Sequence, residues 1–238
     1  PVYNVSHLLG FFSVFNADAI KNVTLTKGGF PARFGGRLSS VLEINMKEGN
    51  NQEFHMEGSI GLVGAKLTIE APIIKNKTSF IVSGRRTYID LIGRPIIKAQ
   101  QSDDLIFDVK LYFYDLNAKI NHKFNEKHRI FASAYLGEDV FGVKTHEKYN
   151  TDDYFKLENS TDWGNITGAL RWNYMINNKL FANTTLTYSK YKFNLVTSTE
   201  DKFGDSFSSF GAKYFSGITD YAAKIDFDYI PDPNHFVR

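Results

Sequence analysis

Residues 112–124, YFYDLNAKINHKF, decide the fold because apolar and polar side chains alternate along them with a period of two. Successive side chains of a β-strand point to opposite sides of the sheet. Apart from His122, the even-numbered positions form an apolar face: Tyr112, Tyr114, Leu116, Ala118, Ile120 and Phe124. The odd-numbered positions after Phe113 are polar, from Asp115 to Lys123. The stretch predicts a strand with one apolar and one polar face.

The same alternation recurs on both sides of this stretch. It is clear in 162–174, 180–190 and 218–229 and weaker in 129–137. Earlier candidate strands are 53–62, 65–71 and 78–86, and a further strand begins at His235. We therefore expect about eight strands before that last one.

The breaks between strands alternate in length. Short polar turns at 75–77, 125–128, 177–179 and 231–234 recur about every 52 residues. Longer polar connections lie between them, at 87–111, 142–160 and 199–213. Short turns at one end and long loops at the other are typical of outer-membrane barrels. A soluble sandwich or lipocalin also has alternating strands, with the apolar face in the core, but the loop asymmetry and strand length favour the membrane.

Aromatic residues on the apolar face cluster near strand ends, where amphipathic rings suit the boundary between acyl chains and headgroups. We expect them to form two girdles. The residues are Tyr112, Tyr114, Phe124, Trp172, Tyr174, Tyr188, Phe227 and Tyr229.

Composition excludes several classes of protein. The 238 residues carry a net charge of +2, so there is no chain-wide basic footprint for nucleic acid. Cysteine is absent, which rules out disulfides and thiolate metal sites. With 21 Phe, 13 Tyr and 18 Gly, the chain favours strands over helices.

Residues 1–50 differ from the rest. They hold short apolar strands and dense glycines, and they lack the long alternation. We place a domain boundary at the polar stretch 47–52, KEGNNQ, which divides the chain into domains 1–50 and 51–238.

The N-terminal domain carries a family resemblance. Residues 18–49, DAIKNVTLTKGGFPARFGGRLSSVLEINMKEG, resemble the end of the plug domain of TonB-dependent outer-membrane receptors. The family pattern is matched by an acidic-led first strand, a glycine-rich centre and a closing strand that ends in lysine. The matching residues are Ile20, Val23, Leu25, Lys27, Gly28, Phe34, Gly35, Gly36, Val41, Leu42, Ile44 and Lys47. Residues 79–91 and 113–124 also resemble early barrel strands of one branch of this family.

The resemblance implies an all-β chain: the end of a plug followed by about eight strands of a transmembrane antiparallel β-barrel that has about 22. We expect a piece of a longer protein that forms an open, curved wall with two unpaired edges. The implied function is active uptake of a scarce small molecule (ferric siderophore, cobalamin or oligosaccharide) across a Gram-negative outer membrane. The alternative is a passive porin or structural barrel, and an outer-membrane hydrolase would need a catalytic pair, which the sequence does not offer.

The resemblance also implies partners. These are outer-membrane lipid and lipopolysaccharide, and the TonB–ExbB–ExbD energy-coupling complex, which would act through a part of the protein outside this chain. The dipeptide Lys27–Gly28 stands where SusC-type glycan importers usually carry a KD-type pair, which weakens the case for a surface lipoprotein partner. We expect no nucleic-acid partner, no cofactor and no enzyme activity.

The candidate site is the glycine-rich plug motif. It comprises Lys27, Gly28, Gly29, Arg33, Phe34, Gly35, Gly36 and Arg37. A phosphate-binding loop is rejected because no GxxxxGK[ST] pattern is present, so the glycines indicate tight turns and close backbone approach inside a barrel. We expect Arg33 and Arg37 to pair with lumen carboxylates such as Asp115.

Other charged residues carry weaker hypotheses. Arg85 and Arg86 precede a long loop, and either bind lipopolysaccharide phosphate or anchor the interface. The histidines are scattered, without HxH or HExxH spacing, so no metal site is expected. Acidic loop residues lack EF-hand spacing and are expected to be solvated: Asp103, Asp104, Glu147, Asp152, Asp153, Glu200, Asp201 and Asp205.

Overall fold

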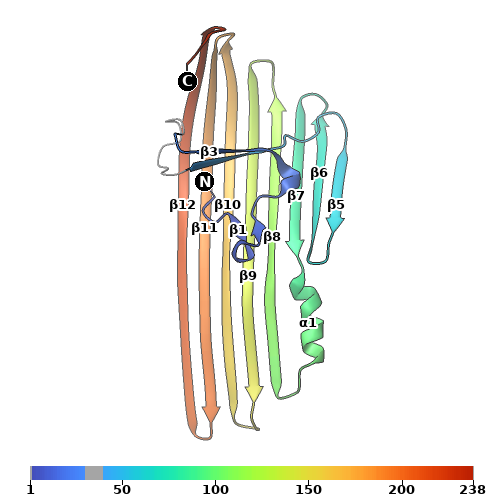
Figure 1. The fold of residues 1–238 in the computed structure, drawn as a ribbon, viewed down its shortest axis with the longest axis vertical. Helices are drawn as coiled ribbons and strands as arrows, with labels where there is room; N and C mark the ends of the chain where they lie inside the picture. The colour runs from blue at the N-terminus through green and yellow to red at the C-terminus, as the bar shows by residue number, and fades with distance from the viewer. Residues whose placement is uncertain (1, 30–39, 238) are drawn as a thin grey trace.

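The computed structural model describes residues 2–29 and 40–237, and strands dominate them, which confirms the all-β class. Nine strands form one antiparallel sheet in sequence order (Figure 1). They are β5 (His55–Ile60), β6 (Gly64–Ile74), β7 (Thr78–Thr87), β8 (Leu105–Lys123), β9 (His128–Lys148), β10 (Tyr154–Asn177), β11 (Leu180–Phe203), β12 (Ser206–Asp232) and β13 (His235–Val237).

The sheet is open. Its order runs from β13 to β5, and among the described residues no strand joins these two edges, so there is no closed barrel. The expected open wall is therefore confirmed, as is the count of eight strands with a ninth that begins at His235.

Two of the three predictions of a long loop are wrong. Residues 142–160 and 199–213 are mostly strand, because β9 and β10 are joined by 149–153 and β11 and β12 by Gly204 and Asp205. We call the parts of β8–β12 that continue beyond the expected strands the extensions. Apolar and polar residues alternate there too, but the apolar side chains are on the other face of the sheet. In β8 they switch from even to odd positions, at Leu105, Phe107, Val109 and Leu111. The sequence prediction followed a single apolar face along the chain. It therefore ended each strand at the position where the apolar residues change face.

The third expected loop, 87–111, contains the helix α1 (Ile89–Ala99) and the start of β8. Arg94 binds Asp108 of β8 through two hydrogen bonds, of 2.7 and 2.6 Å, so the helix is tied to the strand that follows it. No helix in the described part of the chain is long and apolar enough to cross a membrane.

The described residues before position 51, which are 2–29 and 40–50, form a separate set of small elements. They are β1 (Ser6–His7), the 3₁₀ turn η1 (Leu8–Gly10), β2 (Phe12–Ser13), the 3₁₀ turn η2 (Ala17–Ala19), β3 (Ile20–Lys27) and β4 (Ser40–Met46). β1 pairs with β2, and β3 pairs with β4. Figure 1 shows this segment lying across the large sheet.

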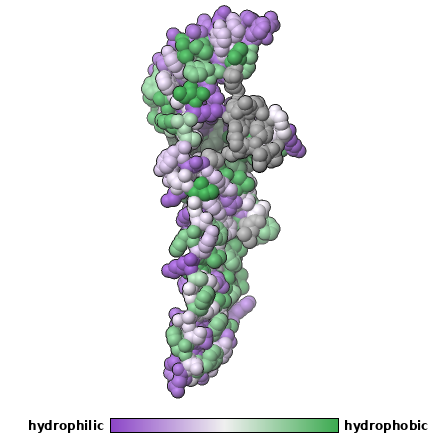
Figure 2. Space-filling model, turned by 90° about the vertical axis from the view of Figure 1, so that its left-hand side faces the viewer, coloured by the Kyte–Doolittle hydropathy of each residue, from purple (hydrophilic) through white to green (hydrophobic). Residues whose placement is uncertain are grey.

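The segment covers the polar face of the sheet, which we call the inner face. Asp115 and Asn121 of β8 are 3% exposed there. On the opposite, outer face of the same strand, Leu116 is 46% and Ile120 39% exposed. Figure 2 shows the wall edge-on. The usual arrangement is inverted: polar residues are buried and apolar residues face outward.

Candidate functional site

The interface between residues 2–50 and the inner face is the most elaborate polar site that the structure describes. Hydrogen bonds reach it from strands far apart in sequence. The Asn165 side chain of β10 donates to the carbonyl of Asn4 over 3.0 Å, and Asn16 of the segment donates to Ser83 of β7 over 2.7 Å. Lys66 of β6 pairs with Asp18 over 2.8 Å. The segment is therefore held by specific polar contacts to many strands.

His7 is the centre of this interface. Its Nδ1 lies 2.6 Å from Oδ2 of Asp139 on β9, and its Nε2 lies 3.5 Å from Oδ2 of Asp115 on β8. The ring stacks on Phe113 at 4.2 Å between centroids, with an angle of 8° between the planes. His7 is 1% exposed.

The chain turns sharply after His7. Leu8 has φ of 47°, a value that residues other than glycine rarely adopt and that the surrounding contacts must hold in place. The Leu8 N–H donates to the second oxygen of Asp139 over 2.7 Å. The buried carboxylate of Asp139 is thus hydrogen-bonded both to the imidazole of His7 and to the backbone N–H of Leu8.

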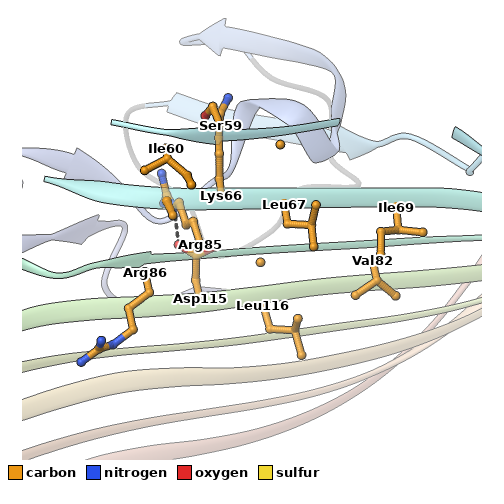
Figure 3. A pocket seen from close by; sticks show the side chains of 13 residues that line it. Ser59, Ile60, Lys66, Leu67, Ile69, Val82, Arg85, Arg86, Asp115 and Leu116 are labelled. Atoms are coloured by element: carbon orange, nitrogen blue, oxygen red, sulfur yellow. Dashed lines mark hydrogen bonds and ion pairs between the residues drawn. The ribbon is translucent and has the colours of Figure 1, made fainter. Parts of the chain in front are cut away.

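Arg85 completes the cluster from β7. Its guanidinium donates to Asp115 and to the carbonyl of Ser13, as Figure 3 shows for the carboxylate. Arg85 therefore has its partners within the chain, on the inner face, and contact with lipopolysaccharide stays a prediction. Arg86 points the other way, over the ring of Tyr112 at 4.8 Å and toward Asp90 at 3.2 Å.

The charges in this cluster favour a protonated His7. Two carboxylates, Asp115 and Asp139, lie against one guanidinium, Arg85, and against the His7 ring. Burial alone would lower the pKa of His7, but hydrogen bonds and Coulomb attraction from Asp115 and Asp139 outweigh it. The net result is a His7 pKa above its ordinary value.

A second group of contacts holds the end of the segment. Arg129 of β9 pairs with Glu48 over 2.6 Å, and Asn121 of β8 donates to the Glu48 carbonyl over 2.7 Å. Gly49 has φ of 81°, and a Cβ there would lie 2.2 Å from the carbonyl oxygen of Phe80 on β7. The backbone passes so close to the sheet that only glycine fits.

The predicted plug motif is described only in part. Lys27 ends β3 opposite Ser40, and Gly28 and Gly29 follow with φ of 63° and 51°, in agreement with a tight turn. The remaining members lie outside the described residues: Arg33, Phe34, Gly35, Gly36 and Arg37. Among the described residues, the cationic partners of Asp115 are Arg85 and His7.

The eight predicted girdle residues all lie on the outer face. Five gather beside the short turns: Phe124, Trp172, Tyr174, Phe227 and Tyr229. Tyr112 and Tyr114 lie at the other limit of the apolar stretch, in the middle of β8 and not at a strand end as expected. Tyr188 stands opposite Tyr221 between the two groups, with 5.2 Å between ring centroids, so it is not at a strand end.

A hollow at the β5 edge is not a coherent site. Its polar members Lys66, Arg85 and Asp115 belong to the inner face, whereas Leu67 and Leu116 belong to the outer face (Figure 3). No group of three or more His, Asp or Glu within the described ranges has metal-binding geometry. Among the acidic loop residues, Asp153 accepts hydrogen bonds from the Gly204 N–H at 2.6 Å and from Asn150.

Sequence reasoning missed His7. It is an isolated histidine before LLG, and no spacing connects it to Asp115 or Asp139. Comparison with known proteins adds no assignment, since the chain matches no family model and has no significant similarity to curated proteins or solved structures.

Proposed function

We propose that this chain is part of an active outer-membrane transporter of the TonB-dependent type, with residues 2–50 as plug and β5–β13 as part of the barrel wall. The observation that carries the proposal is the inverted sheet. Its polar face holds the N-terminal segment, and its apolar face is left open to its surroundings.

The height of the apolar face supports a membrane setting. From Leu116 in β8 to Phe124, the residue just after the strand, the chain runs for about 27 Å at about 3.4 Å per residue, and a tilt of about 40° reduces this to about 20 Å. Outer-membrane barrels have an apolar band about 25 Å tall with aromatic rings at both limits. Beyond that stretch the outer face becomes charged, with ion pairs such as Lys144–Glu158 at 2.7 Å and Lys192–Glu138 at 2.5 Å.

The character of the interface supports a displaceable plug. Its contacts are largely hydrogen bonds and ion pairs, for example at His7, Asp18 and Glu48. Water can replace such contacts when they are broken, so separation costs less than opening an apolar core of equal area. In this proposal the TonB–ExbB–ExbD complex supplies the work that displaces the segment, and the substrate is a small molecule taken up from outside.

The test compares the full-length protein with a variant that lacks residues 2–46. In planar bilayers the intact protein should conduct little and the deletion variant should leak. Uptake by cells should depend on the energised inner membrane only while the segment is present. Glu158→Ala, on the outer surface, is the control that leaves the segment in place.

A passive porin would give the opposite pattern. The intact protein would conduct as well as the deletion variant, and uptake would not respond to a protonophore. A soluble sandwich would appear outside the outer-membrane fraction altogether. Either result would overturn the proposal.

A further inference from the structure

Strands β8–β12 extend well beyond the residues 2–50 that cover the inner face. Figure 1 shows that the lower part of these strands, away from the short turns, is not overlain by the blue segment. The hydrogen bonds and ring contacts of that segment, among the described residues, reach as far as Phe113 and Asp139. The described residues of the segment therefore leave the inner face of the extensions uncovered.

This surface is apolar, unlike the inner face beneath the segment. The register places six large side chains side by side on it, which we call the aromatic patch: Leu111, Phe141, Trp163, Phe193, Leu195 and Tyr214. Trp163 and Phe193 stack with centroids 6.5 Å apart, and Phe193 meets Tyr214 edge-on at 6.1 Å. Trp163 is 7% exposed and forms the floor of the patch, whereas Phe141, Leu195 and Tyr214 are 41%, 39% and 56% exposed.

The two faces of the extensions differ in charge. We consider the part of the sheet between the residues paired across from Phe113 of β8 and those paired across from Phe210 of β12. The described residues of its inner face include no lysine or arginine, and the carboxylate there, Asp139, is already bound to His7. Polar neighbours on this face are uncharged, such as Asn159, Thr161 and Thr197. The cations of the same part of the sheet are on the outer face: Lys110, Lys144, Lys192 and Lys213.

This asymmetry selects a ligand by charge. An anion brought onto the aromatic patch would lose water and find no cation to replace it. A neutral ring would stack on the exposed aromatic side chains, and a cation would also be attracted to the ring faces and to the carboxylates Glu147 and Asp201 farther along the same face.

We propose that the aromatic patch binds an uncharged or cationic small molecule with an aromatic ring, and rejects anionic ones. The proposal rests on the proposed function in one respect: it takes the open inner face as the place where the transported molecule first binds. The binding itself is testable without transport.

The experiment uses the full-length protein in detergent, labelled with 5-fluorotryptophan and observed by ¹⁹F NMR. The Trp163 resonance is assigned with Trp163→Phe. Three probes of similar size differ in charge: benzyl alcohol, benzylamine and benzoate. Trp172 on the outer face is an internal control. A probe that only partitions into the detergent should shift the Trp172 resonance and leave the Trp163 resonance unchanged.

Benzyl alcohol and benzylamine should shift the Trp163 resonance saturably, and benzoate should not. Tyr214→Ser should weaken binding about fivefold. Phe215→Ser is the matched control, since Phe215 is the next residue, is 66% exposed and faces outward. Leu195→Lys should make the patch accept benzoate.

Equal binding of benzoate to the unmodified protein would overturn the inference, and so would a Trp163 resonance that no probe shifts. An inner face occupied by a second copy of the chain, seen as a dimer whose dissociation alone exposes Trp163, would overturn it as well. Because the titration is independent of conductance and uptake, its failure leaves the transporter proposal standing, and the reverse also holds.

Discussion

The imidazole Nδ1 of His7 lies 2.6 Å from a carboxylate oxygen of Asp139, across a sequence separation of 132 residues. The contact joins the N-terminal segment to the middle of the sheet, and both residues are almost fully buried. Burial opposes protonation of the ring, but hydrogen bonds and Coulomb attraction from Asp115 and Asp139 outweigh it and raise the pKa of His7. Attachment of the segment is therefore linked to proton binding.

We predict that attachment weakens as the pH rises. The pKa of His7 is raised in the attached state, so its contribution is complete below about pH 6.5 and is lost as the pH rises through the raised value. Hydrogen exchange at the Leu8 amide measures this, expressed as a protection factor so that the intrinsic pH dependence cancels. His7→Gln should give lower protection that does not vary with pH. A protection factor of the unmodified protein that stays constant from pH 6 to 9 would refute the prediction.

Asp139→Ala should detach β1 and η1. It leaves the His7 ring and the Leu8 N–H buried without an acceptor, and each such loss costs about 1–3 kcal/mol. Protease cleavage within residues 2–15 reports the detachment. Glu158→Ala removes an exposed ion pair with Lys144, which contributes about 0–1 kcal/mol, so its cleavage pattern should match that of the unmodified protein.

Leu186→Arg and Thr187→Arg should differ sharply in assembly. Leu186 is 49% exposed on the outer face, and Thr187 is the next residue on the inner face. If the outer face meets lipid, as we propose, a cation at its middle costs about 2–4 kcal/mol, whereas the inner face is polar. Folding yield into lipid vesicles, followed by the gel shift between unheated and heated samples, compares them. Equal yields would show that the outer face does not meet lipid.

Gly49→Ala should loosen the connection between the segment and β7. A Cβ at Gly49 collides with the Phe80 carbonyl, and the left-handed backbone adds about 1–2 kcal/mol. Gly168→Ala is the control, because a Cβ there meets nothing within 4 Å. Thermal unfolding should shift for the first variant and remain unchanged for the second. A shift of similar size in both would mean that the close approach at Gly49 is not a constraint.

The strands of the wall were predictable because each carries its own signal. In 112–124 the alternation predicts both the strand and the side on which each residue lies, and Asp115 and Leu116 are on the expected faces. The short turn at 177–179 was recognisable from its Asn and Lys residues, and Asn177 accepts backbone hydrogen bonds from Lys179 and Leu180.

The extensions were missed although their sequence also alternates. In 105–113 every odd-numbered residue is apolar, with Ile106 and Tyr112 as apolar exceptions at even positions, and in 116–124 the apolar residues are even-numbered. No register shift separates the two halves of β8, so the chain keeps its geometry while its surroundings change. The same exchange occurs in β11, where Leu186 faces outward and Phe193 inward. A shift of the apolar residues from even to odd positions within one strand therefore marks the point where the apolar side of the sheet changes face.

The sequence by itself determined the local geometry: where strands run, where they turn and which side chains share a face, because side-chain alternation is a property of neighbouring residues. Only the tertiary structure decided which distant groups meet. His7 has no neighbour in sequence that hints at Asp139 or Asp115, and their meeting depends on where β1 lies on the inner face and on the register of β8 and β9. The aromatic patch likewise exists only because five strands in register bring one or two side chains each to the same place.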